Sequence, residues 1–127
     1  MEIIKKSLLI EILKPDFSFK DERGLICQIT HGDIAQVNCV FSKKGAVRGR
    51  YHYHKRAKEQ FYVASGQLKL EVYRDDVREE FCFQTGDCFL IPEGVRHNFT
   101  YLEDTFLVSM YDKCVELADN TKDIFND

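Results

Sequence analysis

Three of the four histidines lie in two short segments whose spacing suits a metal site. His52 and His54 are two residues apart, so on a β-strand both side chains project from the same face. Glu59 follows the polar turn at 55–58, and its carboxylate can return toward the two imidazoles. One histidine alone would more often be an exposed or hydrogen-bonded side chain. With His97, however, the set has three imidazoles and one carboxylate, which suits a divalent transition metal such as Zn, Fe, Mn or Ni.

These two segments resemble the two sequence motifs of the cupin superfamily. The first motif contains a His-x-His pair, a glutamate and a glycine, and the second runs from a glycine through Pro-x-Gly to a histidine. The matching residues are His52, His54, Glu59 and Gly66, then Gly86, Pro92, Gly94 and His97. The resemblance implies a jelly-roll barrel, also called a double-stranded β-helix, with the metal ligands inside it.

A second resemblance, within the same superfamily, is to the nucleotide-sugar epimerases and ketoisomerases. The matching segments are 21–24, 44–49 and 52–55. This resemblance implies that His52 lies where the epimerases keep the base that removes a proton, and that Arg48 lies near a nucleotide diphosphate. The cupin domains attached to capsular-sugar reductases are similar as well. Relative to the epimerases, this chain has one residue inserted between Gly49 and His52, and it has a metal set that epimerases generally lack.

Isomerising a keto-sugar requires a base that removes the proton α to the carbonyl and a group that stabilises the resulting enolate. A metal held by the four side chains would polarise the carbonyl as a Lewis acid. A metal-bound His52 has no free lone pair, so the base would then be a tyrosine or a hydroxide at the metal. The nearest tyrosines in sequence are Tyr53, Tyr62 and Tyr111, and the residues do not decide among them.

Other polar side chains are candidates for ligand binding. If the strand carrying His52 is regular, Arg48 and Arg50 also point inward, where a guanidinium group needs an anion such as a pyrophosphate. Gln36 and Asn38 share one face of the preceding run. They line the cavity if the apolar face of that run packs outward, and otherwise they are solvated.

The elements that must position these residues are short β-strands. The chain has 127 residues, of which 44% are hydrophobic and 31% charged, as expected for one all-β domain. Alternation at 68–72 and 81–83 predicts a hairpin, and the runs 88–91 and 105–111 predict two further strands. We expect a single cupin domain over residues 1–127 with its core at about 20–112. The tail at 113–127 should be irregular, with at most one short helical turn.

The apolar segment at 1–13 predicts an N-terminal strand that packs against a second copy of the chain, and therefore a homodimer. Net charge is −3, and the 18 Lys and Arg are scattered among 21 acids, which argues against nucleic-acid binding. No apolar run approaches the roughly 20 residues of a membrane span, and Lys and Glu interrupt the first 13 residues, so we expect neither membrane nor signal peptide. The expected compartment is the cytoplasm, with the five cysteines as buried, reduced thiols.

The sequence thus predicts a metal-binding cupin that acts as an isomerase or epimerase on a nucleotide-linked keto-sugar in polysaccharide precursor metabolism. Two alternatives remain: a non-catalytic sugar-binding or accessory cupin, and a metal-dependent dioxygenase or lyase. Oxygen uptake with iron would favour the dioxygenase. Retention of metal without turnover would favour the binding protein.

Overall fold

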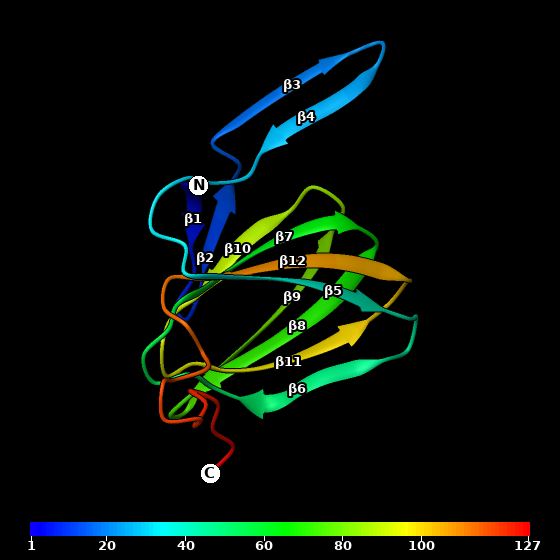
Figure 1. Ribbon diagram of the computed structural model, residues 1–127. Coiled ribbons are helices and arrows are strands. Elements are labelled where there is room, and N and C mark those ends of the chain that lie inside the picture. The colour runs from blue at the N-terminus through cyan, green and yellow to red at the C-terminus, as the bar shows by residue number, and fades with distance from the viewer.

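The alternating and apolar runs of the sequence form twelve β-strands, and the computed structural model, which describes residues 1–127, contains no helix (Figure 1). The strands are β1 (Glu2–Lys6), β2 (Glu11–Lys14), β3 (Phe17–Asp21), β4 (Gly24–Gln28), β5 (Gln36–Ser42), β6 (Val47–His52), β7 (Glu59–Ser65), β8 (Gln67–Arg74), β9 (Val77–Gln84), β10 (Cys88–Ile91), β11 (Arg96–Tyr101) and β12 (Thr105–Tyr111). The predicted all-β jelly-roll fold is confirmed, and the structure has no helix that could span a membrane.

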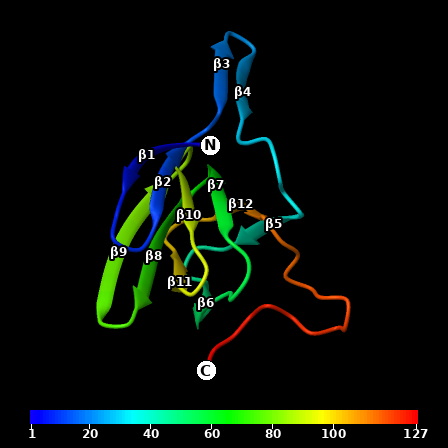
Figure 2. The same cartoon turned by 90° about the vertical axis from the view of Figure 1, so that its left-hand side faces the viewer.

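Two antiparallel sheets face each other and enclose the barrel. One has six strands in the order β1-β2-β10-β7-β12-β5, and the other has four in the order β6-β11-β8-β9. A third sheet, the β3–β4 hairpin, projects away from the barrel in both views (Figures 1 and 2). Strand β5 therefore forms one edge of the larger sheet and β1 the other.

The apolar core fills the part of the barrel between β2, β8, β9 and β10. Leu68, Leu70 and Val72 of β8 are almost completely buried. The Phe89 ring stacks on Phe61 and on Phe83, with ring centroids 4.7 and 4.3 Å apart. The other side of the barrel, between β5, β6, β11 and β12, carries a cavity instead of a continuous core.

The central strand predictions are confirmed. Strands β8 and β9 pair as a hairpin in which Leu68 lies opposite Phe83 and Leu70 opposite Phe81. The apolar runs at 88–91 and 105–111 are β10 and β12, with the predicted bounds. Turn residues bound both runs, which explains why their ends could be read from the sequence.

The N-terminal segment is a hairpin, whereas the sequence predicted one strand packed on a second copy. Strand β2 pairs with β10 of its own barrel, and Leu9, Ile10 and Leu13 are buried there. The turn before β2 is fixed by Glu79, whose carboxylate accepts the backbone N–H of Leu9 at 2.8 Å. The β2 part of this segment therefore belongs to the barrel's own core, whereas Ile3 and Ile4 of β1 are 53% and 63% exposed.

The C-terminal residues 113–127, which we call the C-terminal strap, are irregular as predicted but form two isolated β-bridges. The expectation of buried cysteines is wrong for three of the five. Cys88 is buried and Cys27 half-buried, whereas Cys39, Cys82 and Cys114 are exposed. Cys39 and Cys82 follow the outward-facing rows of their strands, which apolar neighbours in sequence do not reveal.

Candidate metal and ligand site

Pairing between β6 and β11 brings the two histidine segments together. His52 lies opposite His97 in this pairing, and their Nε2 atoms are 3.0 Å apart. His54 follows just beyond the end of β6. One ligating nitrogen from each of these three histidines lies within 4.8 Å of the other two.

Each of the three rings uses its other nitrogen to contact a backbone carbonyl. The Nδ1 atom of His52 lies 2.8 Å from the carbonyl of Gly49, that of His54 2.6 Å from Asp123, and that of His97 3.2 Å from Val95. A proton on Nδ1 leaves the Nε2 lone pair free for a metal. The three Nε2 atoms therefore face one point inside the barrel.

Glu59, at the start of β7, adds the carboxylate. Its Oε1 atom lies 3.2 Å from His54 Nε2 and 3.9 Å from His97 Nε2, and its Oε2 atom accepts a hydrogen bond from Ser109 Oγ. Only 4% of Glu59 is exposed. The structure thus brings all four predicted ligands together, and a buried set of three imidazoles and one carboxylate fits a divalent first-row metal.

Burial and charge keep two of the imidazoles neutral. Burial lowers the pKa of His97 to about 4 and is also the main cause of the lowered pKa of His52. At His54, burial acts in the same direction, but the hydrogen bond and charge of Glu59 outweigh it and the pKa is raised. Burial alone would raise the pKa of Glu59, but the hydrogen bond from His54 lowers it. Ionised carboxylate and neutral imidazole are the forms that bind metals.

A β-bulge in β6 decides which arginine faces the cavity. Gly49, Arg50 and Tyr51 all have positive φ, at 93°, 46° and 65°, and the β6–β11 register shifts at this point. A Cβ atom on Gly49 would lie 2.9 Å from the His97 carbonyl oxygen, so only glycine fits. The bulge takes up the residue inserted before His52. The inward orientation of both arginines was expected only for a regular strand. The bulge breaks that condition, and Arg50 is exposed and does not line the cavity.

The cavity beside the histidines measures about 130 Å³. Its lining residues are Asn38, Val40, Arg48, Gly49, His52, Glu59, Phe61, His97, Phe99, Tyr101, Leu107, Ser109 and Tyr111. Arg48 donates to Ser42 Oγ at 2.8 Å and to the Phe41 carbonyl at 3.2 Å, and forms no ion pair. It is an exposed cation at the edge of the cavity.

Some of the remaining predicted site residues line the cavity, and others lie outside it. Asn38 lines the cavity, whereas Gln36 accepts the backbone N–H of Val115 at 3.0 Å and does not. Tyr111 lines the cavity, and its ring packs edge-on against His54 with centroids 5.4 Å apart.

Tyr53 and Tyr62 lie outside the cavity, contrary to their candidacy as bases. Tyr53 stands between His52 and His54 in the chain, and its hydroxyl donates to Asp127 at 2.9 Å. Burial raises the pKa of Tyr62 to about 12, and its neighbours are Cys27 and Cys88. Alternation explains both positions, since residues next to an inward-facing side chain face outward.

Sequence reasoning missed two residues that contact the ligand set. Ser109 bonds Glu59, and the alternation of β12 with Leu107 and Tyr111 could have placed it inside the barrel. Asp123 bonds His54 from the C-terminal strap. No periodic pattern marks Asp123, because the strap has no regular structure.

Comparisons with known proteins agree with this fold. A family model for the cupin domain matches residues 40–112, while no curated protein matches the chain. Among solved structures, the 3,4-ketoisomerase QdtA of Thermoanaerobacterium thermosaccharolyticum in complex with TDP superposes with a TM-score of 0.81 at 16% identity, covering 96% of this chain and 90% of that one.

Two epimerase structures are similar as well. The rmlC epimerase of Mycobacterium tuberculosis has a TM-score of 0.74 at 19% identity, covering 89% of this chain and 68% of that one. The dTDP-4-dehydrorhamnose 3,5-epimerase of Bacillus anthracis, with TDP and PPi bound, has a TM-score of 0.73 at 21% identity, covering 94% and 81%. These likenesses concern the fold, and the family match covers more than half of the chain. The chain belongs to the cupin family.

Proposed function

We propose that this protein is a metal-binding cupin that isomerises or epimerises a nucleotide-linked keto-sugar used for polysaccharide precursors. The observation that carries the proposal is the convergence of four ligand side chains at a cavity whose edge holds an unpaired arginine. The fold is similar to that of ketoisomerases and epimerases named for dTDP-sugars, which supports the same substrate class.

The size of the cavity and the position of Arg48 favour separate binding places for the sugar and for the diphosphate of such a substrate. A cavity of about 130 Å³ is below the roughly 300–1,000 Å³ of ligand pockets, so a nucleotide sugar would place at most part of its sugar there. The diphosphate would therefore stay at the cavity edge, where the guanidinium group of Arg48 can donate two parallel hydrogen bonds to it. Asn38, on the neighbouring strand, offers an amide to the sugar hydroxyls.

His52, His54, Glu59 and His97 would hold the metal, which would polarise the keto group. Tyr111 is the one predicted tyrosine that lines the cavity. Burial and the nearby Glu59 carboxylate raise its pKa, so its hydroxyl stays protonated and can donate a proton to the enolate oxygen. His52 has a lowered pKa and a neutral ring at pH 7. As a metal ligand His52 has no free lone pair, so the proton next to the keto group would go to a hydroxide held at the metal.

Exchange of the proton next to the keto group tests catalysis directly. The parent, incubated in D₂O with TDP-4-keto-6-deoxyglucose, the ligand of one QdtA structure, should incorporate deuterium at that carbon. Tyr111→Phe should lower the rate at least about 100-fold, the usual effect of losing an acid–base group. Tyr62→Phe, outside the cavity, is the matched control.

Two results would redirect the proposal. Absence of exchange with dTDP- and UDP-linked keto-sugars, in protein that retains its metal, would make the chain a binding cupin. Oxygen uptake by the iron-loaded protein would identify a dioxygenase.

Elemental analysis should find about one metal ion per chain. If His52→Ala and His97→Ala retain as much metal as the parent, the ligand assignment is wrong.

We also propose that the protein is a homodimer held by the β3–β4 hairpin. Phe19 lies opposite Ile26 across the hairpin, and these side chains are 47% and 64% exposed. A two-stranded hairpin alone is marginally stable in water, and exposed apolar patches mark interfaces. Phe41 on the edge strand β5 is 67% exposed and can receive an apolar partner. A second copy of the chain would cover both surfaces.

A further inference from the structure

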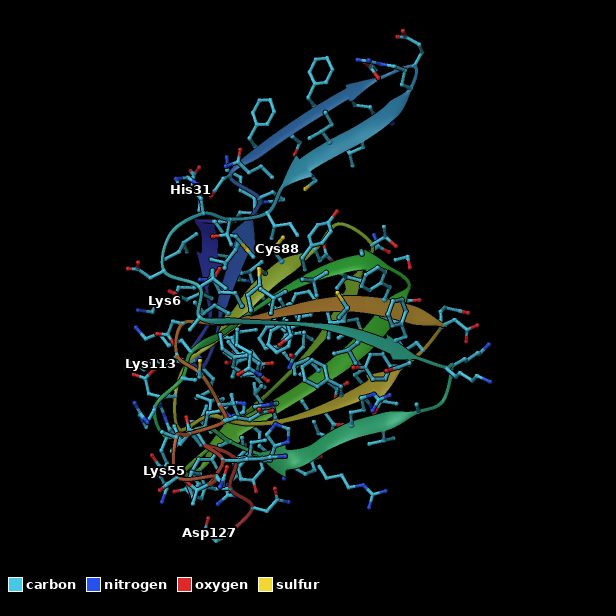
Figure 3. The ribbon with its side chains drawn as sticks, viewed as in Figure 1. Lys6, His31, Lys55, Cys88, Lys113 and Asp127 are labelled. Atoms are coloured by element: carbon cyan, nitrogen blue, oxygen red, sulfur yellow. The ribbon has the colours of Figure 1, made fainter.

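The C-terminal strap crosses the end of the barrel that carries His54. Phe125 exchanges two backbone hydrogen bonds with Tyr53, both of 3.0 Å, and the Lys55 ammonium group lies 4.1 Å from the centre of the Phe125 ring. Lys55 and Asp127 lie at the same end of the molecule (Figure 3), where the strap passes beneath the barrel (Figure 2). The strap thus pairs with the residue before His54 and packs on the residue after it.

Asp123 makes the strap's closest contacts with this segment. Its carboxylate accepts the backbone N–H groups of Lys55, Arg56 and Ala57 at 2.8, 3.0 and 3.0 Å, and its carbonyl contacts His54 Nδ1 at 2.6 Å. The residue is 2% exposed. One residue therefore fixes both the ring of His54 and the turn that follows it.

His54 needs this support because it lies outside the strand ladder. Strand β6 ends at His52, and the next strand, β7, begins at Glu59. In the turn between them, three successive N–H groups form a concave site for an anion, and Asp123 fills it. Without that carboxylate, three donors of the turn would lose their partner, and the turn would have other conformations open to it.

The other two histidines obtain their orientation locally. His52 contacts a carbonyl three residues earlier, and His97 contacts one two residues earlier. The partner of His54 is 69 residues away and outside the matched cupin region at 40–112. The cupin motifs therefore supply the orienting carbonyl for two of the three rings, and the strap supplies the third.

We propose that Asp123 is a positioning residue that sets the ring orientation and tautomer of His54 for metal binding, which makes the C-terminal strap part of the metal site. The strap is anchored by Val115, which is buried against Ala57 and Tyr111, and whose carbonyl accepts the Asp123 N–H at 2.8 Å. This inference rests on the metal binding in the proposed function. Asp123 acts through His54 and does not contact the ion site itself.

Cobalt titration tests the proposal with a spectroscopic signal. Asp123→Asn should weaken Co²⁺ binding by about 10- to 100-fold, the usual effect of losing a partner of a metal ligand, and should change the visible Co²⁺ spectrum. Asp119→Asn is the matched control, because Asp119 is an exposed strap residue that bonds only Thr121. It should bind Co²⁺ with the parent's affinity and spectrum.

A double-mutant cycle separates positioning from general loss of structure. In a His54→Gln background, adding Asp123→Asn should not weaken Co²⁺ binding further, because the ring that Asp123 orients is absent. An equal loss with and without His54 would overturn the proposal. Phe125→Ala is a second, milder variant that loosens the strap and keeps Asp123, and it should weaken Co²⁺ binding in the same direction.

Histidine ¹⁵N spectra of the metal-free protein provide a readout that needs no metal. The parent should show a protonated His54 Nδ1, and Asp123→Asn should shift the His54 Nδ1 signal while the signals of His97 stay in place. Unchanged His54 signals would overturn the proposal. If the parent binds no Co²⁺, the metal part of the proposed function fails, and these spectra still decide whether Asp123 holds His54.

Discussion

The side chains of the histidine cluster have their partners within one chain, whereas the apolar side chains of the β3–β4 hairpin do not. In the cluster, each imidazole has a backbone carbonyl partner, and Glu59 is hydrogen-bonded through both oxygens. In the hairpin, Phe17, Phe19, Leu25 and Ile26 are 47% to 64% exposed. The hairpin's tip carries an Asp21–Arg23 ion pair that faces solvent.

This difference indicates two kinds of functional region. The cluster is preorganised by contacts inside the barrel, so a single chain can hold its metal ligands in place. The hairpin extends away from the barrel, and Figure 3 shows its side chains projecting into open space. Its exposed apolar side chains would be removed from water if another molecule covered them. Substitutions in one region should therefore leave the other unchanged.

Removing the apolar pair of the hairpin should have the largest effect. Fully burying one such side chain contributes roughly 1.5–3 kcal/mol, and in a homodimer both copies carry both substitutions. Phe19→Ser with Ile26→Ser should therefore weaken the dimer by at least about 3 kcal/mol, or more than about 100-fold. Sedimentation velocity at micromolar concentration should show a dimer for the parent and a monomer for the double variant. Co²⁺ affinity should stay the same, because the cluster is complete within one chain.

Val77→Ser is the matched control for this substitution. Val77 is also an exposed apolar residue, at 36%, but it lies at the β8–β9 turn and away from the hairpin. A monomeric parent, or a double variant that dimerises as the parent does, would contradict the assignment of the hairpin to a dimer interface. Deleting residues 1–13 is a poor test, since it removes Leu9, Ile10 and Leu13 from the core.

Between about pH 6.5 and 4, acid should destabilise the metal-free protein through the histidine cluster. Burial lowers the pKa of His97 from 6.5 to about 4. Below pH 6.5, His97 is therefore protonated in the unfolded chain, whereas in the folded chain it is protonated only below about pH 4. Stability should fall across that window by about 3 kcal/mol. The raised pKa of His54 has the opposite sign, and its contribution is complete below pH 6.5 and declines as pH rises above it.

Urea unfolding of the EDTA-treated parent and of His97→Gln at pH 7, 5.5 and 4 measures this window. The variant should lose most of the acid sensitivity between pH 6.5 and 4. Equal slopes for the two proteins would show that His97 does not hold its neutral form in the folded state. Substitutions in the hairpin, such as Phe19→Ser, should leave the slope unchanged, because no titrating group lies in the pair they alter.

The sequence predicted the cluster well because its information is local. Spacing placed His52, His54, Glu59 and His97 on the correct faces, and turn residues marked both ends of β10 and β12. The convergence of these four side chains therefore follows from residue spacing over short stretches of chain, and the jelly-roll barrel follows from the resemblance of these stretches to the cupin motifs. Ser109 was available to the same reasoning, as an inward position of β12.

What could not be predicted depends on broken periodicity or on distant partners. The bulge at Gly49 breaks the alternation of β6, so Arg50 is exposed and does not line the cavity, and nothing in the local sequence pattern indicates the bulge. The hairpin at 17–28 carried a visible turn at 21–24, but its separation from the barrel has no local signal. Asp123 reaches His54 across 69 residues without any regular element.

The smallest effect should come from replacing Arg48, which precedes the bulge, or Arg50, which lies in it. The two substitutions test whether only Arg48 contacts a ligand in the cavity. Arg48 lines the cavity, whereas the backbone of Arg50 is tied to Asn98 and Asn126 and its side chain does not line the cavity. Arg48→Ala should weaken thymidine diphosphate binding by roughly 1.5–3 kcal/mol, or about 10- to 100-fold, the contribution of a hydrogen bond to a charged group. Arg50→Ala removes the same charge two residues away and should bind as the parent does. Calorimetry measures thymidine diphosphate binding by the parent and by both variants. Equal losses of affinity would mean that the two arginines act only through net charge. A parent that binds no tighter than millimolar would contradict the nucleotide-sugar assignment and would not affect the conclusions on the metal cluster and the hairpin.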